Sequence, residues 1–145
     1  MSKFDNSKKS IKKLALPRLY MLTGYNPANS DLFLTKLEKH FMKGIKLAQL
    51  RAKALSTEEY RKLATSAIYL AEKYDAYLLL NTEIQIASDL NAKGIHLTSA
   101  MLKQLTKRPF SKSKLISASC HNKKEFLKAV AIDVDFVTLR DCEDP

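Results

Sequence analysis

Short apolar runs alternate with amphipathic segments along this chain, and this alternation limits the folds that are open to it. The runs have the length of buried strands, and the segments between them repeat apolar residues at helical spacing. The expected strands are residues 19–23, 44–53, 77–80, 95–97, 115–119 and 136–139. Repeated strand-helix units with right-handed crossovers give a parallel sheet, either open and doubly wound or curled into a barrel.

The helices between these strands are predicted from caps and apolar spacing. The clearest helix follows Ser56, which forms a capping box with Glu59. Its apolar residues recur every three or four positions, at Tyr60, Leu63, Ala64, Ala67, Ile68 and Ala71. A second helix spans about 83–91 and ends before Gly94. Another begins after Asn122 and turns Phe126, Val130 and Ala129 inward.

The second strand ends in a row of polar side chains, one amide and two cations. Because side chains alternate across a strand, Leu47, Gln49, Arg51 and Lys53 point the same way if the extended conformation persists. An arginine presents a planar set of donors and a lysine a mobile charge, so this row suits a phosphorylated small molecule. The alternative is a strand that leaves the core, with its last residues simply solvated.

Polar residues also follow the other expected strands: Thr23, Asn81, Thr82, Thr98, Ser99, Ser119 and His121. In both parallel architectures, ligand groups collect beyond the carboxyl ends of the strands. Such residues are also common helix caps, so none of them alone indicates a ligand site. Their shared placement at the strand ends is the better evidence for one.

Composition narrows the class of protein. The chain has 145 residues and a net charge of +10, which favours anionic ligands. We expect a basic flexible tail at residues 1–15 and one domain at 16–145. The lysines do not cluster as in nucleic-acid-binding proteins, although the tail leaves RNA contact open.

No segment resembles a secretory signal or a membrane span. Cys120 and Cys142 therefore indicate free thiols in the cytoplasm. A zinc site formed by these cysteines with His121 is only weakly supported.

Five segments at successive strand ends together carry a resemblance: Leu22-Thr23-Gly24, Gln49-Leu50-Arg51-Ala52-Lys53, Leu78-Leu79-Leu80-Asn81, Gly94-Ile95-His96-Leu97 and Ser117-Ala118-Ser119-Cys120-His121-Asn122. Over residues 16–139 the chain resembles the thiamine phosphate synthase and thiazole tautomerase family. It is most similar to the version fused behind a Nudix hydrolase in some bacteria, although this sequence has no Nudix box. The resemblance implies an α/β TIM-barrel-like fold, here incomplete, with about six of eight parallel strands. The barrel is expected to be truncated after the sixth strand.

The resemblance also implies a reaction and site residues. The family joins an aminopyrimidine methyl diphosphate to a thiazole phosphate and releases pyrophosphate. By motif, Gln49, Arg51, Lys53 and Asn81 would hold the pyrimidine and its diphosphate, and Ser119 would lie near the pyrimidine or the leaving group. His121 falls where the tautomerase branch has an acid-base histidine, a role that imidazole suits near neutral pH. His96 is expected to be packed at its strand end.

Two departures from the family pattern concern Mg²⁺, which the resemblance implies as cofactor. Thr82 and Met101 stand where synthases have metal-binding aspartates. Glu83 could replace the first aspartate, but it is displaced by one residue along the chain. Since Mg²⁺ prefers carboxylate and phosphate oxygens, the metal ligands are not retained and activity is left open. The alternatives are a metal-independent tautomerase-like or regulatory protein that uses His121, and a non-enzymatic fragment that self-associates through open sheet edges.

Overall fold

The computed structural model describes residues 16–24 and 29–139, which form a six-stranded parallel sheet in chain order. The strands are β1 (Met21–Leu22), β2 (Leu47–Leu50), β3 (Tyr77–Leu80), β4 (Gly94–Leu97), β5 (Leu115–Cys120) and β6 (Phe136–Leu139). The expected basic tail at 1–15 and Cys142 lie outside the described residues.

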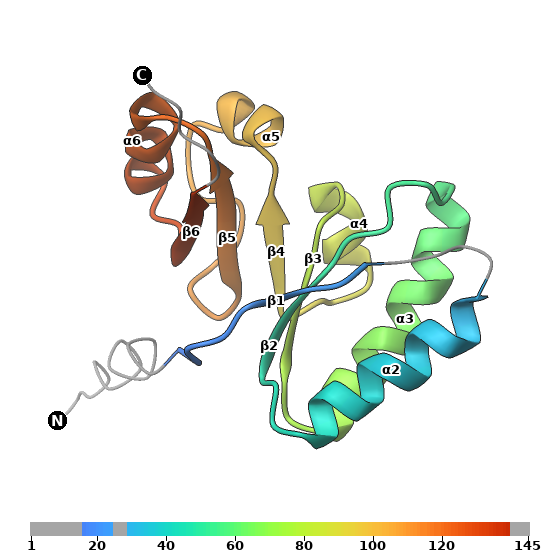
Figure 1. Ribbon diagram of the computed structural model, residues 1–145. Coiled ribbons are helices and arrows are strands. Elements are labelled where there is room, and N and C mark those ends of the chain that lie inside the picture. The colour runs from blue at the N-terminus through green and yellow to red at the C-terminus, as the bar shows by residue number, and fades with distance from the viewer. Residues whose placement is uncertain (1–15, 25–28, 140–145) are drawn as a thin grey trace, which may run out of the picture.

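Helices connect successive strands and cover one face of the sheet (Figure 1). They are α2 (Ser30–Met42), α3 (Thr57–Lys73), α4 (Ile84–Asp89), α5 (Ser99–Gln104) and α6 (Lys123–Ala131). Within the described residues, no helix combines the length and the apolar character needed to cross a membrane.

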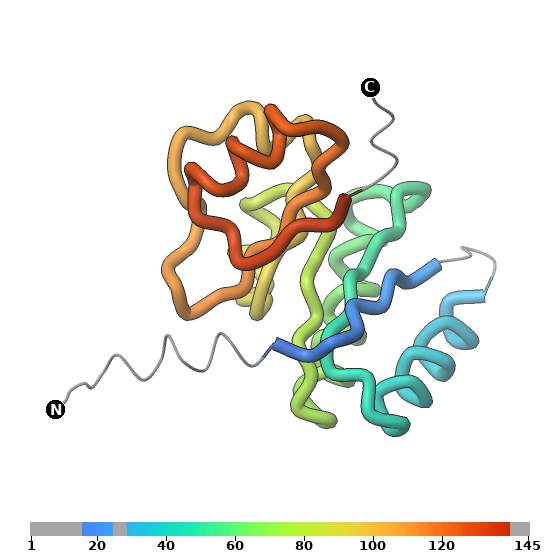
Figure 2. The backbone as a smooth tube through the Cα atoms, turned by 60° about the vertical axis from the view of Figure 1, so that its left-hand side comes forward, coloured from blue at the N-terminus to red at the C-terminus, as the bar shows by residue number. Residues whose placement is uncertain are grey.

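The sheet curls but does not close (Figure 2). In the described part of the chain, β1 pairs only with β2 and β6 pairs only with β5. The result is a curled half-barrel with helices outside, which confirms the predicted incomplete TIM-barrel-like α/β fold. All carboxyl ends of the strands therefore meet at one rim.

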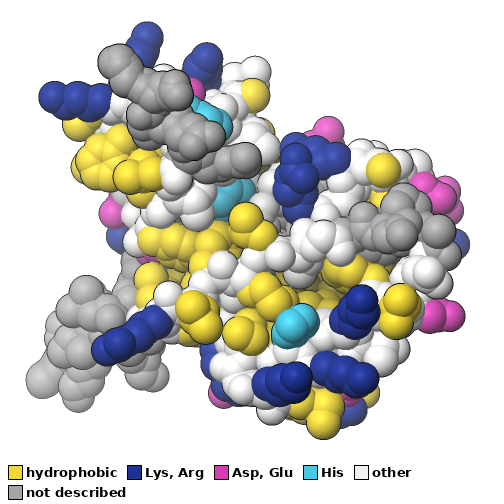
Figure 3. All heavy atoms as spheres, viewed as in Figure 1, with side chains coloured by type: hydrophobic (Ala, Val, Ile, Leu, Met, Phe, Trp, Pro, Cys, Tyr) yellow, Lys and Arg dark blue, Asp and Glu magenta, His cyan; other side chains and the backbone are white. Residues whose placement is uncertain are grey.

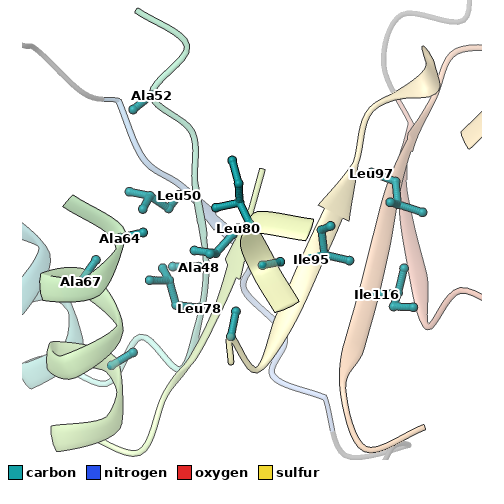
Figure 4. Close-up of a cluster of buried hydrophobic side chains, with 14 of the residues drawn as sticks. Ala48, Leu50, Ala52, Ala64, Ala67, Leu78, Leu80, Ile95, Leu97 and Ile116 are labelled. Carbon is teal, nitrogen blue, oxygen red and sulfur yellow. The ribbon is translucent and has the colours of Figure 1, made fainter. Parts of the chain in front are cut away.

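The outer face of the sheet carries the main core. Ala48 and Leu50 of β2 and Leu80 of β3 are fully buried in this core, which also holds Ala64 and Ala67 of α3 (Figure 4). The inner face has a smaller apolar cluster of Leu47, Leu79 and Leu115, with Leu16, Tyr20 and Phe136 packed against it. The alternation of strand side chains thus divides each strand between two environments.

The predicted capping box at the start of α3 is confirmed. The Ser56 backbone amide donates to Glu59 Oε1 at 3.0 Å, and the Glu59 amide donates to Ser56 Oγ at 3.2 Å. The prediction for α4 was wrong at its end: α4 stops at Asp89, and the chain turns at Asn91 with φ 51°. Gly94 does not end this helix but starts β4.

Two further predictions were wrong in detail. The expected first strand, residues 19–23, is reduced to Met21–Leu22, since only β2 pairs with it. On α6, Ala129 is buried as expected, but Phe126 and Val130 are 40% and 58% exposed. The reason is that, among the described elements, α6 meets mainly α5 and β5, so the rest of its apolar surface is uncovered.

Candidate functional site

Polar side chains line the inner face of the sheet between its apolar base and the rim. On β2 and β5 they come at an even spacing from an apolar base residue of the same strand. Gln49 lies two residues after Leu47, and Ser117 lies two residues after Leu115. Gln49, His96 and Ser117 are 3%, 1% and 0% exposed, and they are the buried polar side chains of the described residues. Because burying unpaired polar groups is costly, each must have partners.

Two amides form the first half of a hydrogen-bond network. Asn81 Nδ2 donates to Gln49 Oε1 at 2.7 Å, and Gln49 Nε2 donates to the Tyr20 hydroxyl at 3.2 Å. The Tyr20 ring packs edge-on against Phe136, and burial raises the pKa of its hydroxyl to about 12. Tyr20 therefore stays protonated and links the amides to the second half of the network.

His96 and two serines of β5 form that second half. His96 Nδ1 lies 2.6 Å from Ser117 Oγ and 3.0 Å from the Tyr20 hydroxyl, and Nε2 lies 2.7 Å from Ser119 Oγ. Burial, together with the charge of Lys53, lowers the pKa of His96 to about 4. The imidazole is therefore neutral near pH 7 and packed at its strand, as expected.

The cations follow directly after β2. The regular strand ends at Leu50, and the side chains of Arg51 and Lys53 are exposed. The backbone here is held by Thr23, whose Oγ1 donates to the Gln49 carbonyl at 2.8 Å and accepts from the Arg51 amide at 3.3 Å. The predicted row is thus divided: Gln49 is buried inside, whereas the two cations reach solvent at the rim.

A cavity of about 330 Å³ opens at the same rim, between the loops that follow β2, β3 and β4. Its lining includes Lys53, Asn81, Thr82, Glu83 and Met101. This donor set does not fit Mg²⁺, since it offers one carboxylate beside a lysine. The positions expected to carry metal-binding aspartates hold the hydroxyl of Thr82 and the thioether of Met101 instead. No cluster of three acidic, histidine or cysteine side chains that could hold a metal occurs in the described parts of the chain.

His121 lies apart from the network formed by Tyr20, Gln49, Asn81, His96, Ser117 and Ser119. It directly precedes α6, its side chain is 46% exposed, and its Nδ1 lies 3.1 Å from Glu125 Oε1. Glu125 also accepts the His121 backbone amide at 2.7 Å. Cys120, the neighbouring candidate for a zinc pair, is fully buried on the outer face.

Of the residues proposed from the sequence, Gln49, Asn81 and Ser119 are therefore joined in one network, Arg51 and Lys53 lie at the rim, and His121 is separate. Sequence reasoning missed Tyr20 and Ser117, and treated His96 only as packing. The signal for Ser117 was its even spacing between Leu115 and Ser119. Tyr20 gave no such signal, because it lies near the start of the expected strand 19–23 and its partners are on distant strands.

Comparison with known proteins supports one family assignment. The family model described as thiamine monophosphate synthase matches residues 19–142. Thiamine-phosphate synthase of Clostridium novyi is 32% identical over 123 residues, which cover 84% of this chain and 60% of that protein. Thiamine-phosphate synthase of Methanobrevibacter smithii is 29% identical over 120 residues, 82% of this chain and 57% of that protein.

A solved structure shares the fold. Thiamine phosphate pyrophosphorylase from Pyrococcus furiosus superposes with a TM-score of 0.64 at 18% identity, covering 83% of this chain and 58% of that one. The present chain thus spans about three fifths of the length of these proteins.

Proposed function

We propose, from the premise that this chain belongs to the thiamine monophosphate synthase family, that it binds an aminopyrimidine methyl diphosphate at its rim and acts in thiamine phosphate synthesis. One observation carries the proposal: Gln49, Asn81 and Ser119 come from three strands and share one hydrogen-bond network, beside which Arg51 and Lys53 reach the rim. Buried amides and a hydroxyl suit a polar heterocycle, and two cations suit a diphosphate.

The proposed reaction joins the pyrimidine to a thiazole phosphate. The thiazole nitrogen supplies the electron pair for the new bond to the pyrimidine methylene carbon, and the carbon-oxygen bond to the diphosphate breaks. Pyrophosphate leaves with that electron pair, so negative charge grows on it in the transition state. Arg51 and Lys53 would stabilise this charge, and Ser119 would donate a hydrogen bond to it.

Mg²⁺ would supply further charge stabilisation in this family, but the rim residues of this chain do not fit it. Lys53 is the positive group that lines the cavity, Glu83 is its carboxylate, and the exposed Arg51 lies two residues before Lys53. The proposal therefore includes binding of the diphosphate by the protein's own cations.

Calorimetric titration of folded protein with the aminopyrimidine diphosphate tests the proposal. We expect saturable binding that weakens about 10- to 100-fold in Arg51→Ala, as for loss of a charge-assisted hydrogen bond. The matched control is Arg61→Ala, which removes a partly exposed arginine whose partner is Asp89 on α4. Absence of binding by the wild-type protein, or equal loss in both variants, would refute the proposal.

A second candidate is a metal-independent tautomerase-like activity that uses His121. The observation that favours it is the contact between His121 Nδ1 and the Glu125 carboxylate, since a carboxylate orients an imidazole for acid-base work. We expect thiazole phosphate isomerisation that survives chelation and is lost in His121→Ala. Isomerisation that persists in this variant would exclude the role.

A third candidate is association through the open sheet edges. Leu22 of β1 and Leu139 of β6 are 60% and 64% exposed, and apolar side chains gather over the strands in the middle of Figure 3. Unpaired edges of this kind favour pairing with another chain. Sedimentation velocity tests this candidate: a mass that rises with protein concentration supports it, and a constant monomer mass excludes it.

A further inference from the structure

Along the hydrogen-bond network inside the sheet, each group donates to the next one in the same order. Asn81 donates to Gln49, and Gln49 donates to the oxygen of Tyr20. Both amides therefore donate toward the interior. The proton of the Tyr20 hydroxyl has to be given onward, because the amide that faces Tyr20 is itself a donor.

The number of hydroxyl protons near His96 then determines which of its ring nitrogens carries the proton. The buried hydroxyls of Tyr20 and Ser117 lie 3.1 Å apart, and both lie near His96 Nδ1, at 3.0 and 2.6 Å. Two hydroxyl protons can be placed among these three atoms only if one lies between the oxygens and the other points to Nδ1. Nδ1 is therefore an acceptor, and the proton of a neutral imidazole is on Nε2.

The proton on His96 Nε2 is donated to the Ser119 hydroxyl. Nε2 lies 2.7 Å from Ser119 Oγ, so this hydroxyl accepts from His96 and has its own proton left to donate. Its neighbour on the other side, Thr138 Oγ1, is 3.5 Å away, at the outer limit for a hydrogen bond. We infer that His96 is a positioning residue, which turns the Ser119 hydroxyl into a hydrogen-bond donor for a phosphate oxygen of the ligand.

This inference deepens the proposed function and rests on it for the ligand. A phosphate oxygen only accepts hydrogen bonds, so a serine that presents lone pairs would repel it. The opposite direction would require both amides to be turned over, and Ser119 would then donate to Nε2. The groups that face His96 come from the segment before β1 (Tyr20), from β5 (Ser117 and Ser119) and from the loop after β2 (Lys53).

Nitrogen NMR of the wild-type protein tests the network without any ligand. We expect the His96 imidazole, identified as the signals lost in His96→Gln, to carry its proton on Nε2 and none on Nδ1 at pH 7. A proton on Nδ1, or protons on both nitrogens, would overturn the inference.

A double-mutant cycle with inorganic pyrophosphate tests the action on Ser119. We expect Ser119→Ala and His96→Leu each to weaken pyrophosphate binding about three- to tenfold, the loss expected for one hydrogen bond. His96→Leu should have no further effect in the Ser119→Ala background, and His96→Gln, which keeps a donor, should restore most of the affinity.

Other outcomes of the cycle count against the inference. Equal losses from His96→Leu in both backgrounds would mean that His96 supports the fold rather than Ser119. Failure of folded His96→Gln to restore affinity would also overturn the positioning role. Wild-type protein that binds the aminopyrimidine diphosphate but not pyrophosphate would overturn the inferred role of Ser119, whereas protein that binds neither would remove the proposed function as well.

Discussion

Lowering the pH from 7 to 5 should reduce the free energy of unfolding by about 2 kcal/mol through His96 alone. In the folded protein the pKa of His96 is lowered from its ordinary value of 6.5 to about 4, first by burial and then by the charge of Lys53. In the unfolded chain the imidazole is protonated below about pH 6.5. The unfolded state therefore binds more protons between pH 4 and 6.5, and stability falls as the pH falls through this range.

The size of the effect follows from the width of that range. Each unit of pKa difference corresponds to about 1.4 kcal/mol, so the whole window amounts to about 3 kcal/mol, of which about 2 kcal/mol is lost by pH 5. His96 is 1% exposed, so solvent screening does not reduce this value much. Tyr20 stays protonated throughout, because burial raises its pKa to about 12.

Urea unfolding of the wild-type protein and of His96→Gln at pH 5, 6 and 7 measures this contribution. Exposed carboxylates with a lowered pKa, such as Glu59, affect both proteins equally, so the difference between the two curves isolates His96. We expect the gap in stability between them to change by about 2 kcal/mol across this range. A gap that does not change with pH would refute the assignment of a buried neutral imidazole.

Two further predictions concern the fold. Gly94→Ala should destabilise the protein by about 1–3 kcal/mol in urea unfolding, because the added carbon would lie 2.5 Å from the Leu115 carbonyl oxygen. Gly24→Ala is the matched control, since nothing lies within 4 Å of its added carbon, and equal losses in both variants would contradict this account. Ser56→Ala should cost about 1 kcal/mol by removing the cap of α3, whereas an unchanged denaturation midpoint would show that the cap is dispensable.

Much of the fold could be predicted because local signals and burial agree. The run Leu78–Leu80 is apolar on both faces, and the structure buries it between the outer core and the inner cluster. The box of Ser56 and Glu59 is a local feature that needs no knowledge of the rest of the chain. Such elements are fixed by residues a few positions apart.

Features that depend on distant partners could not be predicted. The exposure of Phe126 depends on which elements cover α6, and an amphipathic pattern does not say this. The role of Gly94 depends on the approach of the Leu115 carbonyl from the next strand. Gly94 therefore looked like a helix breaker in the sequence, although it is a packing residue.

The candidate site shows the same division. The placement of Gln49, Asn81 and Ser119 toward the same rim of the sheet follows from the parallel order of the strands. The link between them depends on Tyr20 and on the inward orientation of His96, which come from register and packing. For this reason the separate polar residues were visible in the sequence, and the network that connects them was not.

Mapping the bound ligand on the protein tests the central claim most directly. We would titrate isotope-labelled protein with the aminopyrimidine diphosphate and follow the backbone amide signals. Binding at the rim predicts the largest shifts at Arg51, Asn81 and Ser119. Shifts confined to the cavity between β1 and α2, which His40 and Phe33 help to line, or no shifts at any concentration, would contradict it.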